Sequence, residues 1–544
     1  MAEMTGGQAL VASLIKQGVD TVFGLPGVQL DWLFDAIWEK RDQIKVYYTR
    51  HEQGTAYMAD GYARTTGKVG TCIVVPGPGL LNAMAGLATA YSASSPVLCV
   101  TGQIRSDAIE QGRGLLHEIP NQLDMVRSAT KWAARAMSPA EVPGVVEEAF
   151  RQLRSDRVRP VEIEVPPDIL QASGQVTIPG RVAEQRLQGD PELLDKAAKL
   201  LGEAQRPVII AGGGVIRSGA SDELKALAEM LQAPVVMSSH GKGSLSYRDD
   251  LALNPNALDE LVPGADVVLL VGNRYVEYGI NEWWRPAKGQ VGIRLDTDAE
   301  MLERSQPTLG ILTDAMLGLA ELVERVGKYN HAREPRTAEL KALKAHLEDL
   351  WWEVQPQAAY ATVLREELPD DGILVSESTQ VGYWSDRAFP VYEPRTYLTS
   401  GYQGTLGYGY ATALGAQVGN PDRKVVSING DGGFMYNVQE LGTAVQQGIN
   451  AVGVVFNDRA YGNVRRTQRL NFNGHIIATD LHNPDFVKLA DSFGMAGIRA
   501  EGPEGLRAAL REALALKGPA LIEVPVNEMP NIRTTLQSAQ ARTR

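Results

Sequence analysis

The chain has 544 residues, of which 44% are hydrophobic and 22% charged, a composition typical of globular proteins that fold as several domains. Its formal net charge of −12 argues against a general nucleic-acid binder, because such proteins present a basic surface to the phosphates. The two cysteines, the start at Met1 without a signal-like segment, and the lack of an apolar run of ~20 residues predict a cytoplasmic protein with no membrane partner.

The first part of the chain alternates between strand-like and helix-like segments. Thr5, followed three positions later by Gln8, forms a capping-box pattern before a helix that Gly18 ends. Strands are expected at residues 45–48, 69–75 and 96–101, with helices from about residue 52 and after residue 79. This alternation predicts a parallel, doubly wound sheet with helices on both faces.

The same alternation recurs twice, after segments that we interpret as linkers. Residues 171–188 are polar and irregular, and residues 329–344 are charged and helix-prone. The second part has apolar runs that begin at residues 206, 233 and 265, and the third part has strands at 424–428 and 451–456. We therefore predict an α/β fold with three doubly wound parallel-sheet domains, at residues 1–170, 190–330 and 355–530.

Two details of the third part are also predicted. A helix is expected to begin at Asn437, because Asn437 and Glu440 have the spacing of an N-terminal cap. The residues after about 530 have the character of a tail.

Polar residues follow two consecutive apolar strands of the third part. Gly430-Asp431-Gly432-Gly433 comes directly after the first, and Asp458 stands 27 positions after Asp431, just beyond the second. In open α/β sheets ligands bind outside the carboxyl ends of the strands, so both carboxylates can converge there. Glycines around Asp431 allow close backbone approach, and a hard cation such as Mg²⁺ prefers oxygen ligands that include phosphate oxygens.

A Gly-Asp-Gly tripeptide alone is more often a turn between a strand and a helix. The pair Asn457-Asp458 at this spacing favours a ligand site instead. The combination resembles the signature of thiamine-diphosphate enzymes, in which Gly-Asp-Gly and a pair usually written Asn-Asn bind the metal that holds the diphosphate. The resemblance implies metal ligands from Asp431, Asp458 and the carbonyl of Ala460. Asp458 departs from the usual Asn because it adds a negative charge.

The segment from Arg50 to Arg64 resembles the catalytic-glutamate motif of the acetohydroxyacid synthase branch of these enzymes. Thiamine chemistry needs a carboxyl group hydrogen-bonded to the aminopyrimidine ring, and the resemblance assigns this role to Glu52. The alternative is an acidic residue in the first turn of a helix, which the helix dipole favours. The family's arrangement also implies that the first and third parts meet across subunits, in a homodimer or homotetramer.

The resemblance to acetohydroxyacid synthases extends over nearly the whole chain, including Phe23 to Gly27, Gly77 to Asn82, Ser400 to Gly407, and Gly442 to Gln446. It implies that the cofactor is bound by Pro26, Gly77, Asn82, Gln380, Gly404, Leu406, Gly430, Gly432, Gly433, Tyr461, Gly462 and Asn463. Leu406 falls where the family places the bulky apolar residue that supports the bent cofactor, although core packing would also favour a large side chain there.

Several positions depart from the synthase pattern. The Arg that grips the second 2-keto acid aligns with Tyr278, and the Trp that selects this substrate aligns with Thr467. His117 replaces a Gln, and Val381 replaces the His expected after Gln380. Losing a bidentate Arg removes an interaction of roughly 1.5–3 kcal/mol, so a second 2-keto acid would bind poorly.

We therefore expect a thiamine-diphosphate and Mg²⁺ enzyme that decarboxylates a small-molecule 2-keto acid, with or without ligation to a second carbonyl compound. His117 and Gln403 are candidates for the groups beside the reacting carbon, with His117 as a proton donor. A lone His is more often structural, and the same holds for His51. A hydrolase or lyase of a diketone or acyl-CoA, and a non-catalytic cofactor-binding paralogue, are alternatives.

FAD is possible but not expected in the second part of the chain. Gly212-Gly213-Gly214 precedes a predicted helix, but Arg217 occupies the final glycine position of a dinucleotide-binding turn. The Gly-Met-His-Gly loop that contacts FAD in the synthases is replaced by Asn254-Pro255-Asn256-Ala257.

Overall fold

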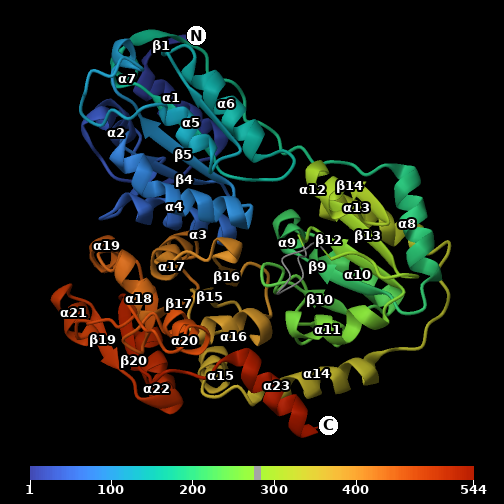
Figure 1. Cartoon of the computed structure of the whole chain (residues 1–544). Coiled ribbons are helices and arrows are strands. Elements are labelled where there is room, and N and C mark those ends of the chain that lie inside the picture. Colours follow the sequence, from blue (N-terminus) through green and yellow to red (C-terminus); the bar gives the residue numbers. More distant parts are fainter. Residues whose placement is uncertain (275–283, 544) are drawn as a thin grey trace. The chain divides into compact units, whose positions relative to one another are not determined.

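The computed structural model of the protein describes residues 1–274 and 284–543. It contains three six-stranded sheets, each built from parallel strands and flanked by helices (Figure 1). This arrangement confirms the predicted α/β class with three parallel sheets. Both cysteines, Cys72 and Cys99, are buried and unbridged on neighbouring strands of the first sheet.

The first sheet has the strand order β3-β2-β4-β5-β7-β6. Its strands are β2 (Thr21–Gly24), β3 (Lys45–Tyr48), β4 (Gly70–Val74), β5 (Val97–Gly102), β6 (Trp132–Arg135) and β7 (Val161–Val165). Its helices are α1 (Gly6–Gln17), α2 (Asp31–Glu39), α3 (Glu52–Thr66), α4 (Pro78–Ala93), α5 (Gln122–Arg127), α6 (Val142–Leu153) and α7 (Pro167–Gln171), with 3-10 turns η1 (Val28–Leu30) and η2 (Ser106–Ala108). The capping box of Thr5 and Gln8 and the left-handed Gly18 at the end of α1 are present as predicted.

The second sheet has the strand order β11-β10-β9-β12-β13-β14. Its strands are β9 (Val208–Ala211), β10 (Val235–Met237), β11 (Ala252–Leu253), β12 (Val267–Val271), β13 (Val291–Asp296) and β14 (Leu309–Leu312). The helices around it are α8 (Pro191–Glu203), α9 (Gly213–Ser218), α10 (Ser221–Leu231), α11 (Leu258–Leu261), α12 (Ala299–Ser305) and α13 (Ala315–Val326). Aliphatic residues of β9 and β12 form the buried centre of its core.

The third sheet has the strand order β16-β15-β17-β18-β20-β19. Its strands are β15 (Ile373–Ser376), β16 (Tyr397–Thr399), β17 (Val425–Gly430), β18 (Val452–Asn457), β19 (Ala496–Arg499) and β20 (Ala520–Pro525). The associated helices are α15 (Gln357–Glu367), α16 (Gln380–Ala388), α17 (Tyr408–Gly419), α18 (Asp431–Phe434), α19 (Glu440–Gln447), α20 (Gly462–Asn471), α21 (Phe486–Ser492) and α22 (Gly502–Ala515). Parallel pairing places Gly430 opposite Phe456, so β17 and β18 end at the same edge of the sheet.

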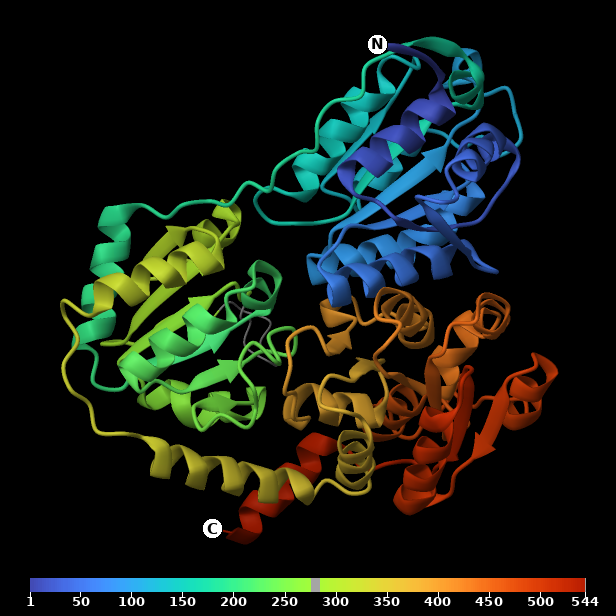
Figure 2. The same ribbon diagram turned by 180° about the vertical axis from the view of Figure 1, so that it is seen from behind.

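Three segments differ from the sequence expectations. Strand β8 (Ser173–Val176) lies inside the expected first linker, where it pairs antiparallel with β1 (Ala2–Thr5). The second expected linker contributes to α14 (Thr337–Trp352), and the expected tail forms α23 (Ile532–Thr543). Figures 1 and 2 show α14 and α23 side by side, where they contact each other.

The predicted cap at Asn437 is wrong. The helix begins at Glu440, and the Asn437 amide instead donates to the carbonyl of Gly407. The carboxylate of Glu440 accepts hydrogen bonds from backbone amides of a distant segment. The two side chains that would have formed a local cap therefore form hydrogen bonds with tertiary partners instead.

By its internal contacts the chain divides into two compact units. The first comprises Met1–Gln185, Ser400–Arg499 and Glu512–Glu523, and the second comprises Arg186–Thr399, Ala500–Arg511 and Val524–Arg544. Within the first unit, α3 packs along α17, and α17 packs against β17 of the third sheet. In the part of the chain that the structure describes, no helix combines the length and the apolar character needed to span a membrane.

Candidate active site

Asp431 and Asp458 occupy equivalent places at one edge of the third sheet. Asp431 is the first residue of α18, directly after β17, and its side chain is only 2% exposed. Asp458 is the first residue after β18. Because β17 and β18 are parallel neighbours, their ends place the two carboxylates side by side, as the sequence predicted for a ligand site.

The two carboxylates interact strongly. Burial raises the pKa of Asp431, and burial together with the negative charge of Asp431 raises the pKa of Asp458 to about 6. A hydrogen bond joins the two side chains. Two carboxylates this close repel each other when both are ionised, and a bound cation would offset that repulsion.

An asparagine that sequence reasoning missed holds this pair in place. The side-chain amide of Asn483 donates to Asp431 and, at 2.9 Å, to Asn457 Oδ1. Asn457 in turn donates to the buried carboxylate of Glu523, at 2.8 Å. No local pattern marks Asn483, because it lies 52 positions after Asp431 in an irregular segment.

Two glycines are required by close contacts in this loop. A Cβ atom on Gly462 would lie 2.3 Å from Asp458 Oδ2, and one on Gly432 would lie 2.6 Å from the ring of Tyr461. The amide of Ala460 donates to Asp458 Oδ1 at 3.2 Å, which turns the chain around the carboxylate. Gly462 therefore lets the backbone pass directly against a candidate metal ligand.

This donor set fits a hard divalent cation. It offers two carboxylates and nearby backbone carbonyls, which are the oxygen ligands that Mg²⁺ prefers. Within residues 1–274 and 284–543 no group of three or more His, Cys, Asp or Glu side chains is placed to hold a metal. A cation here would therefore need further oxygen ligands from the backbone and from a bound diphosphate.

Glu52 begins helix α3 in the first unit. The imidazole of His51 caps that helix by accepting from the amide of Gln53, so His51 has a structural role here. The Asn82 amide donates to Glu52 Oε2 at 2.9 Å, which joins two of the predicted site residues. A Cβ atom on Gly79 would lie 3.6 Å from Glu52 Oε1. Glu52 thus lies against the first turn of α4, half-exposed and available to a ligand.

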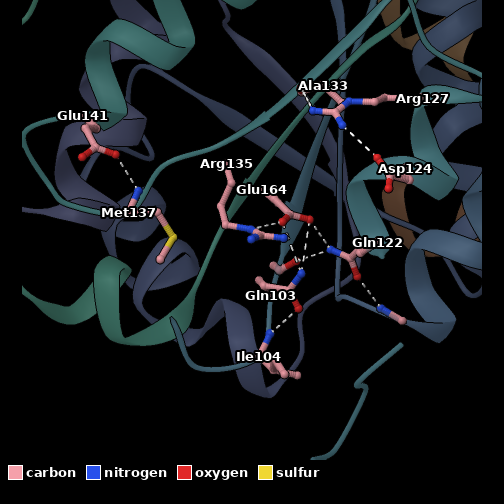
Figure 3. Close-up of polar contacts among 12 residues, drawn as sticks. Gln103, Ile104, Gln122, Asp124, Arg127, Ala133, Arg135, Met137, Glu141 and Glu164 are labelled. Atoms are coloured by element: carbon pink, nitrogen blue, oxygen red, sulfur yellow. Dashed lines mark hydrogen bonds and ion pairs between the residues drawn. The ribbon is translucent and has the colours of Figure 1, made fainter. Parts of the chain in front are cut away.

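The start of α4 is anchored by a buried polar network, shown in Figure 3. Gly77, with a positive φ of 59°, donates its amide to Gln122 Oε1 at 3.0 Å. Gln122 Nε2 donates to the carboxylate of Glu164 at 2.7 Å, and Glu164 also pairs with Arg135 and accepts from Gln103. Glu164 is fully buried, so this pairing satisfies a charge that would otherwise be costly.

His117 packs over the same turn. Its carbonyl oxygen would lie 2.3 Å from a Cβ atom on Gly77, so only glycine fits at position 77. His117 itself has a positive φ of 70°, an uncommon conformation for a residue with a side chain. Its Nδ1 lies 2.9 Å from Gln29 Oε1. The turn of α4 therefore brings together Gly77, His117 and Glu52.

Comparison with known proteins identifies the family. Three family models of the thiamine pyrophosphate enzymes match the chain: the N-terminal thiamine-pyrophosphate-binding domain over residues 4–125, the central domain over residues 194–322, and the C-terminal binding domain over residues 377–524. The chain belongs to the thiamine pyrophosphate enzymes.

The similar proteins place this thiamine pyrophosphate enzyme in the acetolactate-synthase-like branch. A probable 2-ketoarginine decarboxylase of Pseudomonas aeruginosa is 35% identical, covering 96% of this chain and 94% of its own. The acetolactate synthase isozyme 2 large subunit of Escherichia coli is 33% identical over 97% of both chains. A probable acetolactate synthase large subunit of Methanocaldococcus jannaschii is 33% identical, covering 96% of this chain and 92% of its own.

The other predicted residues of this thiamine pyrophosphate enzyme lie on turns and helix starts. Pro26, Gln403, Gly404 and Asn463 are exposed, and Leu406, Tyr461 and Gly462 are half-buried. Gly430 is the N-cap of α18, and Gly433 is buried within that helix. Gln380 begins α16 in the second unit, followed by the fully buried Val381. Thr467 is exposed on α20, and Tyr278 lies outside the described residues.

The glycines after β9 have a packing role in the second unit. A Cβ atom on Gly212 would lie 2.1 Å from the carbonyl oxygen of Gly272, and one on Gly214 would lie 2.7 Å from the Gly272 Cα. The Gly214 amide also donates to the Gly272 carbonyl, at 3.1 Å. Contact between the ends of β9 and β12 explains these glycines without a dinucleotide.

Proposed function

We propose that this thiamine pyrophosphate enzyme decarboxylates a 2-keto acid, with Mg²⁺ and thiamine diphosphate bound at the Asp431–Asp458 edge. The observation that carries the proposal is the convergence of the buried Asp431 carboxylate and the half-buried Asp458 carboxylate at the ends of β17 and β18. Ligation of the product to a second carbonyl compound is a further outcome of the same chemistry.

Asp431, Asp458 and the carbonyl of Ala460 would hold Mg²⁺. Burial and the negative charge of Asp431 raise the pKa of Asp458 to about 6, and a bound divalent cation would offset both effects. Gly432 and Gly462 would admit the diphosphate to the backbone, because neither projects a side chain into the loop. Asn483 would keep Asp431 oriented by its hydrogen bond.

Glu52 would supply the carboxyl group that the aminopyrimidine ring requires. When bound, thiamine diphosphate would supply the nucleophilic carbon and the electron sink that decarboxylation of a 2-keto acid requires. Asn82 holds the Glu52 carboxyl in place, and Gly79 leaves space beside it. Since Glu52 is half-exposed within one chain, we propose that the site is completed by a second subunit, in a homodimer or homotetramer.

Decarboxylation is favoured over acetolactate synthesis by two residues. Thr467 is exposed on α20 where the synthases have a bulky Trp, so it offers little apolar surface to a second substrate. His117 stands where the synthases have Gln, and an imidazole ring, unlike an amide, can both donate and accept a proton in catalysis. Because one similar protein is named a probable 2-ketoarginine decarboxylase, a 2-keto acid with a basic side chain should be among the substrates tested.

The test compares the wild type with Glu52→Gln and Glu192→Gln. CO₂ release would be measured with thiamine diphosphate and Mg²⁺ from pyruvate, a branched 2-keto acid and 2-ketoarginine, with a diketone and an acyl-CoA as separate arms. We expect Glu52→Gln to lose at least 100-fold in kcat. Glu192 also lies in the first turn of a helix and is exposed, so Glu192→Gln controls for loss of a helix-dipole interaction.

Three outcomes would contradict the proposal. Unchanged turnover in Glu52→Gln would remove the role given to Glu52. Turnover of only the diketone or the acyl-CoA would indicate the hydrolase or lyase alternative. Cofactor binding without turnover of any substrate would indicate a non-catalytic paralogue.

A further inference from the structure

The side-chain amide of Gln29 connects two atoms of the His117 segment. Gln29 lies in η1 and is only 8% exposed. Its Nε2 donates to the backbone carbonyl of Leu116 at 3.0 Å, and its Oε1 lies 2.9 Å from His117 Nδ1. The amide group of Gln29 therefore contacts both the backbone of Leu116 and the imidazole ring of His117.

These two contacts determine which ring nitrogen of His117 carries a proton. The carbonyl of Leu116 can only accept, so the NH₂ group of Gln29 must face it. The amide oxygen consequently faces Nδ1, and an oxygen can only accept from a ring nitrogen. His117 Nδ1 is therefore protonated, and in the neutral ring Nε2 carries the lone pair.

The backbone of His117 fixes where this ring stands. The residue is held at a positive φ of 70°, and its carbonyl oxygen packs on Gly77 at the start of α4. The Glu52 carboxyl lies against Gly79 in the same helical turn. The backbone of His117 and the carboxyl of Glu52 thus both pack against the start of α4, and His117 as a residue is half-buried.

Several charged residues lie on the elements around His117, and some of them have partners of their own. Glu118, next in sequence, accepts from the amide of Leu115, which holds the pKa of Glu118 below its ordinary value. Asp168 on α7 accepts from Ser106, and Asp107 pairs with Arg105. Other charged groups on the neighbouring elements are Asp31, Asp35 and Glu39 on α2, Glu52, Asp60 and Arg64 on α3, and Glu110 and Arg113 in the loop before His117.

We propose that Gln29 is a positioning residue that keeps the His117 proton on Nδ1, so that Nε2 exchanges a proton with the substrate. This inference rests on the proposed decarboxylation. In the imidazolium form, the Nε2–H bond breaks and a C–H bond forms at the carbon from which CO₂ has departed, using the electron pair left there. The neutral ring retains its Nδ1 proton on Gln29 and regains the Nε2 proton from water.

The first test needs no turnover. Nitrogen-15 NMR of the imidazole rings distinguishes the two neutral tautomers in protein labelled at histidine, and His117→Gln identifies the His117 signal. His331, whose Nδ1 lies 3.0 Å from the carbonyl of Gly202, provides an internal reference for the same tautomer. We expect His117 to match His331 in the wild type. A wild-type His117 protonated on Nε2 in its neutral form would overturn the inference.

Two variants of Gln29 sharpen the test. Gln29→Leu keeps the size but removes the acceptor, so protonation on Nε2 should increase and kcat should fall roughly 10-fold or more. Gln29→Glu places a carboxylate beside the ring, so the NMR titration midpoint of His117 should rise by about one pH unit or more, with that of His331 unchanged. The basic limb of the kcat profile should rise with it, which loss of packing alone would not cause.

Failure of the inference and failure of the proposed function give different results. Normal decarboxylation with an unchanged His117 titration in Gln29→Glu would overturn the role of Gln29 alone. The expected tautomer and titration shift, in a protein that decarboxylates no 2-keto acid, would support the Gln29–His117 pair as a structural device and overturn its catalytic use. Far-ultraviolet circular dichroism of both variants would verify that they fold.

Discussion

The buried carboxylate of Glu440 accepts a hydrogen bond from the backbone amide of His51, the residue that caps the helix beginning with Glu52. The same carboxylate accepts from the amide of Arg50, and both contacts measure 3.1 Å. A Cβ atom on Gly54 would lie 2.9 Å from Glu440 Oε1, so the two helices touch. Helix α19 therefore holds the start of α3 from within the same chain.

Glu440→Gln should weaken this connection. A glutamine can accept from only one of the two amides and turns its NH₂ group toward the other, so we expect a loss of about 1–3 kcal/mol in unfolding free energy. Because the start of α3 carries Glu52, kcat should fall more than KM rises. Urea unfolding and steady-state kinetics would measure both effects.

Gln446→Ala is a matched control for that prediction. Gln446 lies on the same helix and accepts from the Arg50 side chain, but the contact is exposed. Its removal should therefore change stability by less than about 0.5 kcal/mol. Equal losses of unfolding free energy in the two variants would show that the contacts of Glu440 stabilise the protein no more than the exposed contact of Gln446 does.

Gly462→Ala should impair metal binding with little effect on the fold. The added Cβ would lie 2.3 Å from Asp458 Oδ2, so the carboxylate must move from its present position. We expect the Mg²⁺ concentration for half-maximal activity to rise about 10-fold or more, as for other changes that disturb ligand orientation. Gly144→Ala is the control, because a Cβ at that site in α6 meets nothing within 4 Å. An unchanged Mg²⁺ requirement would contradict the assignment of Asp458 as a ligand.

Asp458→Asn should separate charge from geometry at the same site. The amide keeps an oxygen ligand but removes the carboxylate that Asp431 repels, so the metal-free protein should become more stable. Mg²⁺ should bind more weakly, because one negative charge is lost. Thermal unfolding with and without Mg²⁺ and thiamine diphosphate would show both effects. A metal-free variant less stable than the wild type would contradict the repulsion described above.

The convergence of Asp431 and Asp458 could be predicted from the sequence because its parts are local. Gly430-Asp431-Gly432 follows one apolar strand and Asp458 follows the next, so strand periodicity and the topology of parallel sheets were sufficient. The start of α3 at Glu52 followed from the same alternation. These features depend on residues that are adjacent in the chain.

The contacts that position the site could not be predicted in this way. Glu440 and Arg50 are 390 positions apart, and His117 is 88 positions from Gln29. Only the tertiary fold brings such pairs together, and the side chains involved have no distinctive local pattern. The failed cap at Asn437 has the same cause, since distant backbone groups competed successfully for Asn437 and Glu440.

A buried lysine in the second unit gives a prediction about stability and pH. Lys242 is 1% exposed, and its ammonium group donates to the carbonyls of Ser385 and Phe389 near the end of α16. It also lies 5.0 Å from the ring centre of Tyr397, whose hydroxyl donates to Asp386. Burial lowers the pKa of Lys242 to about 7, with Asp386 opposing that shift.

Between pH 7 and about 10, the unfolded chain therefore binds more protons at Lys242 than the folded protein does, since an unfolded lysine titrates near 10.4. The unfolding free energy should rise with pH over this range, with a contribution from Lys242 of roughly 1 kcal/mol per pH unit. Lys242→Met should remove this slope, whereas Lys196→Met, at an exposed site in α8, should retain it. Urea unfolding of the three proteins at pH 7, 8 and 9 measures the slopes directly. If Lys242→Met and the wild type show the same slope, the Lys242 ammonium remains charged in the folded protein throughout this range, held by the two carbonyls at the end of α16.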